Sequence, residues 1–422
     1  MKILYVSFYF PPFNTMGGIR AGGQVRALEE AGHSVKVLSS NHQGHFPKLD
    51  LGIFDVNLYN VASSDQTAMH LRNSRKPFYQ TIKGLILNSR WSSLKEVLLI
   101  TKDILDSEFG IHKKWKKMIL EDVQSIKDWE PEIILASYSP ISSLLIGKKL
   151  SKKLNISFFA EMRDSWSFNP VVSRKKEDNY FSKILQKYES YLLRDCAGII
   201  SATDFIHQYY LSLHPSIPNQ KIYGGYDSHN LQIGESKINK MGKKFVITHA
   251  GSLLQGRKSP EMLFKSISSN KKLKENYAIN FFGNDQDQVI LLAKKYSLQE
   301  NVSCMGSIDY HDCKKSEEDS DILLMLMQNN DNEKYAVTGK VFDLIKLKKD
   351  ILMIYGKKSE AEEIVVNSGL GMALENENDI KDYLLRFLSN QDKNVQANHH
   401  FIESLSRKNQ ISLMIGFINQ NI

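Results

Sequence analysis

Segments with the composition of buried strands alternate with helical segments along this chain, and the alternation restricts the fold more than any other feature. The first repeat is a predicted strand at 2–7, a helix at 20–31 that Gly32 ends, and a strand at 34–39. Because strands that alternate with helices form parallel sheets covered on both faces, the sequence predicts an α/β protein. The later strands are predicted near residues 133–136, 156–161 and 197–201, and then near 244–250, 278–282, 302–305, 322–325, 351–355 and 371–374.

Two domains are expected, because a single core stops growing at roughly 250 to 300 residues and this chain has 422. The polar, turn-rich stretch 223–242 separates the two strand series and is the best linker candidate. We place the boundary near Asp227, which gives an N-terminal domain of residues 1–226 and a C-terminal domain of residues 227–400. The amphipathic segment 401–422 is expected to be a helix that could cap either domain, including a return to the N-terminal one.

The composition is that of a soluble globular protein, with 42% hydrophobic and 24% charged residues. No apolar run approaches the roughly 18 residues that a membrane-spanning helix needs. The start MKILYVSFYFPPF lacks a small-residue cleavage site, so a cytoplasmic location is expected. The three cysteines, Cys196, Cys304 and Cys313, are too few and too scattered for a disulfide framework or a four-ligand zinc site. No metal site is therefore predicted.

Positive charge is concentrated in one segment. The formal net charge is +8, and residues 71–120 carry eleven Lys or Arg against four Asp or Glu. Aromatic residues, among them Trp91 and Trp115, lie in the same segment. This mixture suits contact with an anionic membrane surface or a phosphorylated lipid, and it equally suits a solvated helical face. Both interpretations stay open, and nucleic acid is not expected as a partner.

Ligands of open parallel sheets bind beyond the carboxyl ends of the strands, so the loops that follow strands are the candidate sites. In the first such loop, Gly17 and Gly18 stand directly before the predicted helix and would let backbone N–H groups approach a phosphate or sugar. Each glycine taken singly is equally consistent with a structural turn. The sequence has no G-x-G-x-x-G after the first strand and no G-x-x-x-x-G-K-[ST], which argues against a dinucleotide dehydrogenase and a P-loop NTPase.

A second candidate is the segment FFAEMRDSW, which contains Glu161, Arg163, Asp164 and Trp166 at the end of an apolar strand. Carboxylates accept paired hydroxyl hydrogen bonds and an aromatic face stacks on a sugar ring, so this group suits sugar recognition. The alternative is an Arg163–Asp164 surface pair with Trp166 in the core. The position at a strand terminus favours the functional interpretation.

The third and fourth candidates belong to the second series. In HAGSLLQGRKSP, Gly251 and Ser252 follow a strand, and Arg257 and Lys258 precede a helix, where fixed cations and the helix dipole would together bind a diphosphate. An exposed basic turn is the alternative. In TGKVFDLIKLKKD, Thr338 is the predicted N-cap, and Lys340 and Asp343 share one face of the helix, which suits a phosphate and a ribose diol. The apolar positions of that helix, such as Val341, are expected in the core.

Taken in order, these segments resemble the family-4 glycosyltransferases over almost the whole chain. The resemblance rests on ILYVSFYFPP with AGHSVKVLSS, on SYSP with FFAEMRDSW, and on YESYLLRDCAGIISAT in the first half. In the second half it rests on HAGSLLQGRKSPEML, TGKVFDLIKLKKDILMIYGKKSEAEEIVVNSGLGMAL and the closing SRKNQISLMIGFI. The resemblance implies a GT-B fold, in which two Rossmann-like domains face an interdomain cleft.

The resemblance also implies an activity and roles for individual residues. The family transfers a sugar from a nucleotide diphosphate sugar, generally with retention of configuration and without a metal or other cofactor. Arg257 or Lys258 together with Lys340 would be the catalytic cations that hold the diphosphate. Donor contacts are implied for Gly17, Gly18, Gly251, Ser252, Gly339, Val341 and Asp343, and acceptor-side roles for Glu161, Arg163, Asp164 and Trp166.

The sequence departs from the family at one point. The family often carries two acids eight positions apart near the ribose, and here Tyr335 stands in place of the first. By resemblance the acceptor would be a carbohydrate, plausibly a lipid-linked oligosaccharide or surface polysaccharide precursor at the inner face of the cell membrane. Two alternatives stay open: a nucleotide-sugar epimerase of the same fold, and a non-catalytic protein that binds a sugar nucleotide or a membrane surface.

Overall fold

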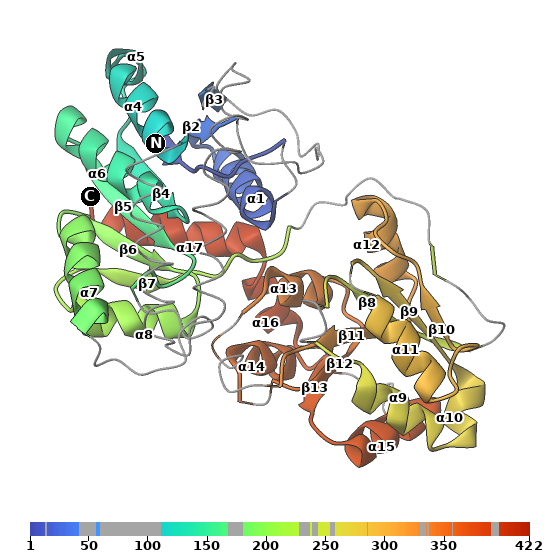
Figure 1. The fold of residues 1–422 in the computed structure, drawn as a ribbon. Helices are drawn as coiled ribbons and strands as arrows, with labels where there is room; N and C mark the ends of the chain where they lie inside the picture. Colours follow the sequence, from blue (N-terminus) through green and yellow to red (C-terminus); the bar gives the residue numbers. More distant parts are fainter. Residues whose placement is uncertain are drawn as a thin grey trace. The chain divides into compact units, whose positions relative to one another are not determined.

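The computed structural model divides the chain into two compact units, which are described separately here (Figure 1). The first unit consists of Met1–Gly224 and Arg407–Ile422, and the second of Gly225–Ser406. The structure describes residues 1–12, 15–41, 56–59, 111–167, 180–227, 237–238, 244–253, 258–284, 286–329, 335, 337–356, 358–389 and 396–422.

The first unit is built on a seven-stranded sheet with the order β3-β2-β1-β4-β5-β6-β7, and every pairing among the described strands is parallel. From β1, the chain adds β2 and β3 on one side of the sheet. It then returns to add β4 to β7 on the other side, so the strand order reverses between β1 and β4. The strands are β1 Lys2–Val6, β2 Ser34–Ser40, β3 Val56–Tyr59, β4 Ile133–Tyr138, β5 Ser157–Met162, β6 Gly198–Ser201 and β7 Asn219–Lys221.

Helices cover both faces of this sheet because successive strand residues point to opposite faces. Ile3 and Tyr5 of β1 join one core cluster, with residues of α1 and α17, and Leu4 and Val6 join another, with residues of α4, α6, α7 and α8. The chain's final helix therefore completes the core of the first unit. The helices are α1 Met16–Glu30, α4 Ile111–Glu121, α5 Val123–Asp128, α6 Ile141–Leu154, α7 Tyr180–Leu193, α8 Asp204–Leu213 and α17 Arg407–Gln420.

The second unit has a six-stranded sheet with the order β10-β9-β8-β11-β12-β13, again parallel throughout its described pairings. Its strands are β8 Phe245–Ala250, β9 Tyr277–Phe282, β10 Val302–Cys304, β11 Ile322–Leu326, β12 Asp350–Ile354 and β13 Gly371–Leu374. Its helices are α9 Glu261–Ser268, α10 Lys271–Asn276, α11 Asp287–Lys295, α12 Tyr310–Glu318, α13 Gly339–Lys346, α14 Glu360–Asn367, α15 Glu377–Leu388 and α16 His399–Ser404.

The predicted fold class, two parallel α/β units, is confirmed. Two short edge strands, β3 and β7, were not predicted from the sequence, because they lack the long apolar runs of the central strands. The units divide at Gly224 rather than residue 226, and the chain re-enters the first unit at Arg407 rather than residue 401. Within the described residues, none of the helices combines the length and apolar character that crossing a membrane requires.

The start of α1 differs from the prediction. The helix begins at Met16, with Thr15 as its N-cap, so Gly17 and Gly18 lie inside the first turn and not in a loop before the helix. The Thr15 side chain accepts a hydrogen bond from the Gly18 N–H at 2.9 Å. A capped first turn forms readily at this point because the cap satisfies a donor that would otherwise have no partner in the helix.

Candidate functional site

The point at which strand order reverses in the second sheet lies between β8 and β11, and the carboxyl ends of such strands are where parallel sheets bind ligands. Lys340, in the first turn of α13, reaches this edge. Its ammonium group donates to the carbonyl of Ala250, the last residue of β8, and lies 3.4 Å from Nδ1 of His249. A cation from α13 is thereby fixed at the end of β8.

Lys340 is held in an environment that disfavours its charge. Burial lowers the pKa of its ammonium group to about 8, and repulsion from Lys258 and Lys314 acts in the same direction, against attraction by Glu317. A group buried with like charges gains more than an exposed one from an anionic ligand. The site thus has the electrostatic character of an anion-binding site.

A second cation, Lys314 of α12, lies between two carboxylates that α12 and α13 supply. Its ammonium group is 3.0 Å from an oxygen of Glu317 and 3.0 Å from Oδ2 of Asp343. These two carboxylates raise the pKa of Lys314 well above its usual value, although burial alone would lower it. Lys314 is thus paired with two carboxylates, whereas Lys340 has no carboxylate within ion-pair distance among the described residues.

The sequence did not single out Lys314 or Glu317. They are spaced as an ordinary i, i+3 pair in the polar segment YHDCKKSEE, a pattern typical of solvated helix faces. Only the approach of α12 to the start of α13 gives them a place at the site.

His249 is buried, with 3% of its surface exposed. Its Nδ1 lies 3.0 Å from the carbonyl oxygen of Leu324, so this nitrogen carries the proton. Burial, Lys340 and Lys258 lower the pKa of His249 well below its usual value, and the ring is neutral. Nε2 is buried with no hydrogen-bond partner among the described residues.

Two glycines let the backbone bend at the ends of β8 and β9. Gly251 has φ +138° and Gly283 has φ +119°, conformations that other residues rarely adopt. A Cβ on Gly283 would lie 2.5 Å from the carbonyl oxygen of Gly251. Gly251 and Ser252 are exposed, so the end of β8 presents backbone rather than bulky side chains.

The other residues predicted to contact the donor differ in exposure. Gly339 is exposed in the first turn of α13 and Val341 is fully buried, as expected for a core position. Thr338 occupies the N-cap position without a side-chain hydrogen bond. Arg257 lies outside the described residues, and so do residues 71–110 of the basic segment 71–120.

At the carboxyl edge of the first sheet, Glu161 is buried in a closed network. Its carboxylate pairs with Arg20 at 3.0 Å and accepts a hydrogen bond from Gln24 at 2.6 Å, and Tyr5 lies 3.4 Å away. Burial raises its pKa, but Arg20, Arg163 and the hydrogen bonds outweigh burial and lower the pKa overall. Because Glu161 has no exposed surface, it does not offer its oxygens to a sugar as we expected from the sequence.

Arg163 fastens the loops around this edge. Its guanidinium donates to the carbonyls of Tyr138 at 2.6 Å, Ser139 at 3.1 Å and Gly17 at 3.3 Å. A Cβ on Gly17 would lie 3.1 Å from Nη1 of Arg163, so the glycine permits the guanidinium to come close. The ends of β4, β5 and α1 are thereby held together.

Trp166 and Asp164 differ in exposure. Asp164 is exposed, whereas Trp166 is 5% exposed and its ring centroid lies 5.5 Å from that of Tyr188. The Trp166 backbone N–H donates to the buried carboxyl of Glu189, which also accepts hydrogen bonds from Ser167, Tyr209 and Tyr210. Trp166 is a core residue, and its ring does not present the face for sugar stacking that the sequence suggested.

Solved structures similar to this chain share one architecture. HepE of Anabaena in complex with UDP matches with a TM-score of 0.61 and 12% identity over 100% of both chains. WaaG, a glycosyltransferase involved in lipopolysaccharide biosynthesis, matches with a TM-score of 0.56 and 12% identity over 99% of both chains. The chain has the GT-B fold.

The same fold occurs with a different activity. A putative UDP-N-acetylglucosamine 2-epimerase from Listeria monocytogenes matches with a TM-score of 0.55 and 11% identity, over 99% of this chain and 96% of its own. No family model matches the sequence, and no curated protein matches it. At these identities the likeness shows the fold, and the activity has to be argued from the site.

In chemical terms, the edge of the second sheet can bind an anion. It has fixed cations, exposed backbone at Gly251 and a helix N-terminus at α13. Among the residues that the structure describes, no three His, Cys, Asp or Glu side chains are grouped so that they could hold a metal ion.

Proposed function

We propose that this protein is a glycosyltransferase that moves a sugar from a nucleotide diphosphate sugar to an acceptor. The observation that carries the proposal is Lys340, a partly buried lysine whose ammonium group lies at the carboxyl end of β8 beside Lys258 and Lys314. A diphosphate supplies the negative charge that this group lacks. The GT-B fold and the UDP complex of HepE support the choice of a nucleotide sugar as donor.

In the proposed reaction, the second unit binds the donor. Lys340 and Lys258, with Arg257, hold the diphosphate, and negative charge grows on this group as its bond to the sugar breaks. Cations placed in advance stabilise that charge without reorganising. Asp343 binds the ribose diol, for which it exchanges its contact with Lys314. Gly251, Ser252 and Gly339 bring backbone groups to the donor.

The first unit is proposed to bind the acceptor. Arg163 and the Glu161 network act by fixing the loops after β4 and β5, and Asp164 is the exposed polar group of that edge. We further propose that the enzyme belongs to glycosyltransferase family 4, is hexosyltransferase-like, retains anomeric configuration and needs no metal. The acceptor is a lipid-linked oligosaccharide or polysaccharide precursor, reached from the cytoplasm at the inner face of the membrane.

Donor binding can be tested without knowledge of the sugar or the acceptor. Thermal unfolding is measured with UDP, GDP and ADP, and with the corresponding diphosphate sugars. A ligand that binds only the folded state at 100 times its Kd adds about 2.7 kcal/mol of stability, so the melting temperature rises. We expect one nucleoside diphosphate to stabilise the wild type, in the presence of EDTA as well as magnesium, and to leave Lys340→Ala unchanged.

Lys348→Ala is the matched control, because Lys348 is an exposed lysine just beyond the same helix. This variant should respond to the nucleotide as the wild type does. If no nucleoside diphosphate raises the melting temperature of the wild type, the proposed donor site is wrong. If inorganic phosphate were the only ligand that stabilised the protein, the site would bind anions without recognising a nucleotide.

The epimerase alternative has a specific basis in the shared fold of the Listeria protein. An epimerase needs no acceptor. Incubation of the stabilising nucleotide sugar with the protein, with and without lipid extract, separates the two activities. An isomerised nucleotide sugar in the absence of acceptor supports the epimerase, and free nucleoside diphosphate that accumulates only with extract supports the transferase.

A further inference from the structure

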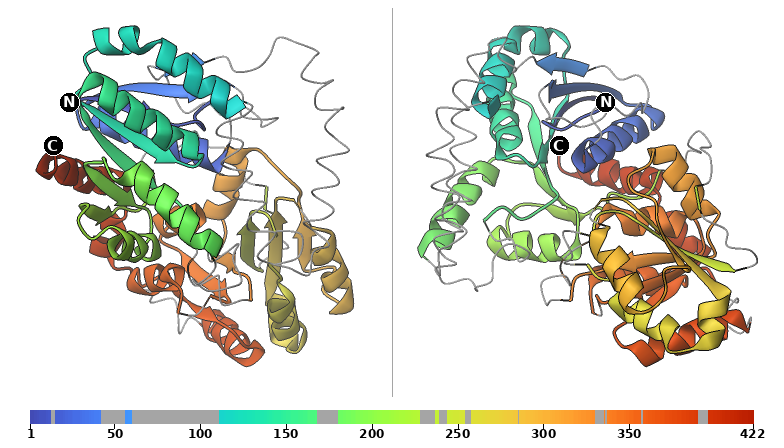
Figure 2. Two further views of the ribbon diagram at one scale, coloured as in Figure 1. Left: turned by 60° about the vertical axis from the view of Figure 1, so that its left-hand side comes forward. Right: turned by 45° about the vertical axis from the view of Figure 1, so that its right-hand side comes forward.

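Three helices of the first unit form a surface on which exposed basic residues outnumber exposed acidic ones, and we name it the basic face. Helices α4, α6 and α7 lie side by side, with α6 in contact with both neighbours (Figure 2). On them and on the turn after α7, the exposed acidic residues are Glu121 and Asp195, both paired with lysines. The exposed basic residues number nine: Lys113, Lys114, Lys117, Lys149, Lys152, Lys153, Lys183, Lys187 and Arg194.

The basic face is not explained by the stability of its helices. Cations stabilise the last turn of a helix, which accounts for Lys152 and Lys153 of α6. Lys113 and Lys114 of α4 and Lys183 of α7 lie in first turns, where the helix dipole opposes positive charge. Helix α5, which follows α4, carries one basic residue, Lys127, and one acidic residue, Asp128, so it adds no net positive charge to the basic face.

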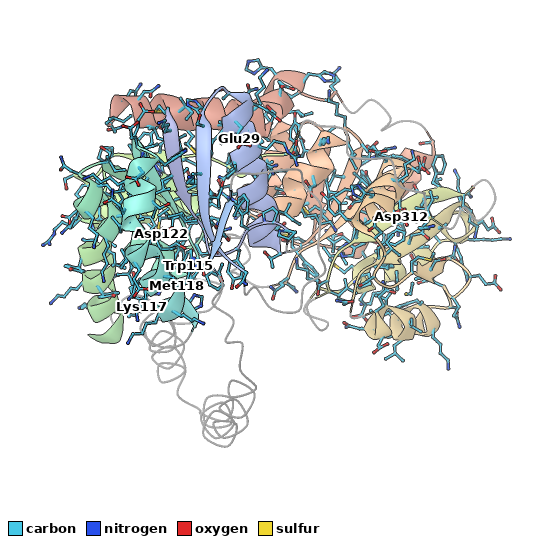
Figure 3. All side chains as sticks on the ribbon, turned by 90° about the horizontal axis from the view of Figure 1, so that it is seen from above. Glu29, Trp115, Lys117, Met118, Asp122 and Asp312 are labelled. Carbon is cyan, nitrogen blue, oxygen red and sulfur yellow. The ribbon has the colours of Figure 1, made fainter. Side chains whose placement is uncertain are left out.

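The helices turn their apolar residues to the sheet and most of their cations outward; Lys116 of α4 and Lys148 of α6 are buried. In α4, Trp115 is fully buried, whereas the side chain of Lys117 is 72% exposed; both are labelled in Figure 3. The exposed cations therefore stand on the outer surface of this helical layer. Their backbone positions on the three helices make the charge excess a property of the fold.

A polar hollow and an exposed aromatic ring lie at one end of the basic face. The hollow has a volume of ≈ 500 Å³; Lys152, Arg194 and Asp195 are among the residues that line it, and the Asp195 carboxylate forms ion pairs with both cations. Tyr191, 52% exposed, has its ring centroid 4.3 Å from Nζ of Lys148 and 5.6 Å from Cζ of Arg194. Three cations share the single Asp195 carboxylate, so positive charge remains at the rim, which suits a phosphate headgroup. An exposed tyrosine beside them suits the boundary between water and lipid.

We propose that the basic face docks on an anionic phospholipid surface. Eight of its nine cations are lysines, whose long apolar stems and single ammonium groups suit a diffuse layer of headgroups better than the planar, bidentate recognition for which arginine is used. The inference names the surface at which a lipid-linked acceptor is met, and in this respect it rests on the proposed function.

The test is sedimentation with vesicles of phosphatidylcholine, with and without phosphatidylglycerol, at low and high salt. The wild type should bind only the anionic vesicles and should be released by salt. Each basic residue near an anionic surface contributes about fivefold to the binding constant. The triple variant Lys149→Glu, Lys153→Glu, Lys187→Glu should therefore bind at least about a hundredfold more weakly.

The matched control has the same change in net charge on the second unit: Lys272→Glu, Lys294→Glu, Lys348→Glu, all at exposed positions. It should bind vesicles as the wild type does. Equal weakening of the two triple variants would mean that only net charge matters and would overturn the proposal. Tighter binding of single-stranded RNA than of anionic vesicles at equal phosphate concentration would overturn it as well.

Stabilisation by the nucleoside diphosphate is measured on the same variants and separates this inference from the proposed function. Both triple variants should keep the nucleotide response of the wild type, because neither changes Lys340, Lys258 or Lys314. Vesicle binding without any nucleotide response would leave the membrane surface standing and remove the donor site. A nucleotide response without vesicle binding would support the donor site and overturn the proposed membrane surface.

Discussion

The carboxyl edges of the two sheets use charge in different ways. At the edge of the first sheet, the Glu161 carboxylate pairs with Arg20 and accepts from Gln24, and three carbonyls take up the guanidinium of Arg163. At the edge of the second sheet, Lys314 is paired with Glu317 and Asp343, and burial lowers the pKa of Lys340 to about 8. At the first edge, hydrogen bonds and an ion pair within the chain hold both guanidinium groups, whereas at the second edge Lys340 has no carboxylate within ion-pair distance in the part of the chain that the structure describes.

This difference indicates that the first edge has a structural role and that the second edge can bind an anionic ligand. A buried carboxylate that is fully paired specifies the local structure, and its loss leaves its partners uncompensated. A buried lysine without a paired carboxylate lowers the stability of the free protein, and an anion relieves that cost. Substitutions at the first edge should therefore change folding, and substitutions at the second should change ligand binding.

The largest effect is expected for Glu161→Ala. Removal of one partner from a buried ion pair costs about 3 to 5 kcal/mol, because Arg20 is left with an uncompensated charge. Denaturant unfolding should show this loss, while the folded fraction should keep its affinity for the nucleoside diphosphate. Glu132→Ala is the control, since the Glu132 side chain is 58% exposed and such surface pairs contribute about 1 kcal/mol or less. Equal costs for the two variants would contradict a scaffold role for the network.

Lys340→Ala should have the next largest effect, and on ligand binding rather than on folding. Loss of one group that stabilises a developing negative charge usually costs about 3 kcal/mol, roughly a hundredfold in rate. Calorimetric titration with the nucleoside diphosphate and turnover of the nucleotide sugar are the measurements. The melting temperature of the free variant should not fall, because the buried charge is removed together with the side chain. Near-normal turnover would remove Lys340 from the site.

A smaller effect, about 1 to 3 kcal/mol of unfolding free energy, is expected for Gly283→Ala. The added Cβ would meet the Gly251 carbonyl, and φ of +119° strains any residue other than glycine. The end of β8 should shift, so the variant should bind the nucleotide more weakly and should also be less stable. Gly416→Ala in α17 is the control; nothing lies within 4 Å of its Cβ position, and alanine should there stabilise the helix slightly. An unchanged melting temperature for Gly283→Ala would show that the two loops are not in close contact.

The smallest effect is a pH dependence. Lys340 binds an anion only when protonated, and its pKa in the free protein is about 8. Nucleotide affinity should therefore be constant below that pH and fall by up to about tenfold per pH unit above it. Lys340→Arg should lack this decline, because the guanidinium stays protonated. A decline of the same size in the arginine variant would assign the titration to another group.

The sequence predicted the fold well because central strands of parallel sheets are continuous apolar runs, such as ILLML at β11. It also placed Lys340 and Asp343 on one side of α13, since helix spacing follows directly from sequence. The edge strands β3 and β7 are only 4 and 3 residues long and carry no such signal. Short, half-exposed strands depend on a neighbour that is already in place.

The candidate site was predicted less completely, because its residues have partners that lie far away in the sequence. Glu161 is read from its own segment as a free carboxylate, and its partners Arg20 and Gln24 come from α1, far earlier in the chain. Trp166 faces the same difficulty, because Glu189 and Tyr188 that enclose it belong to α7. Helix spacing relates side chains on one element, but the environment of Glu161 and of Trp166 is assembled from several elements and does not follow from their own segments.

The return of the chain into the first unit at Arg407 has a consequence for synthesis. Ile411, Met414 and Phe417 of α17 belong to the same core cluster as Ile3 and Val25, so that cluster waits for the last helix to leave the ribosome. The second unit, encoded without interruption between Gly225 and Ser406, is complete earlier and can fold first. A nascent chain that stops before Arg407 carries an uncovered apolar face, which would mark a prematurely terminated product for chaperones and proteases.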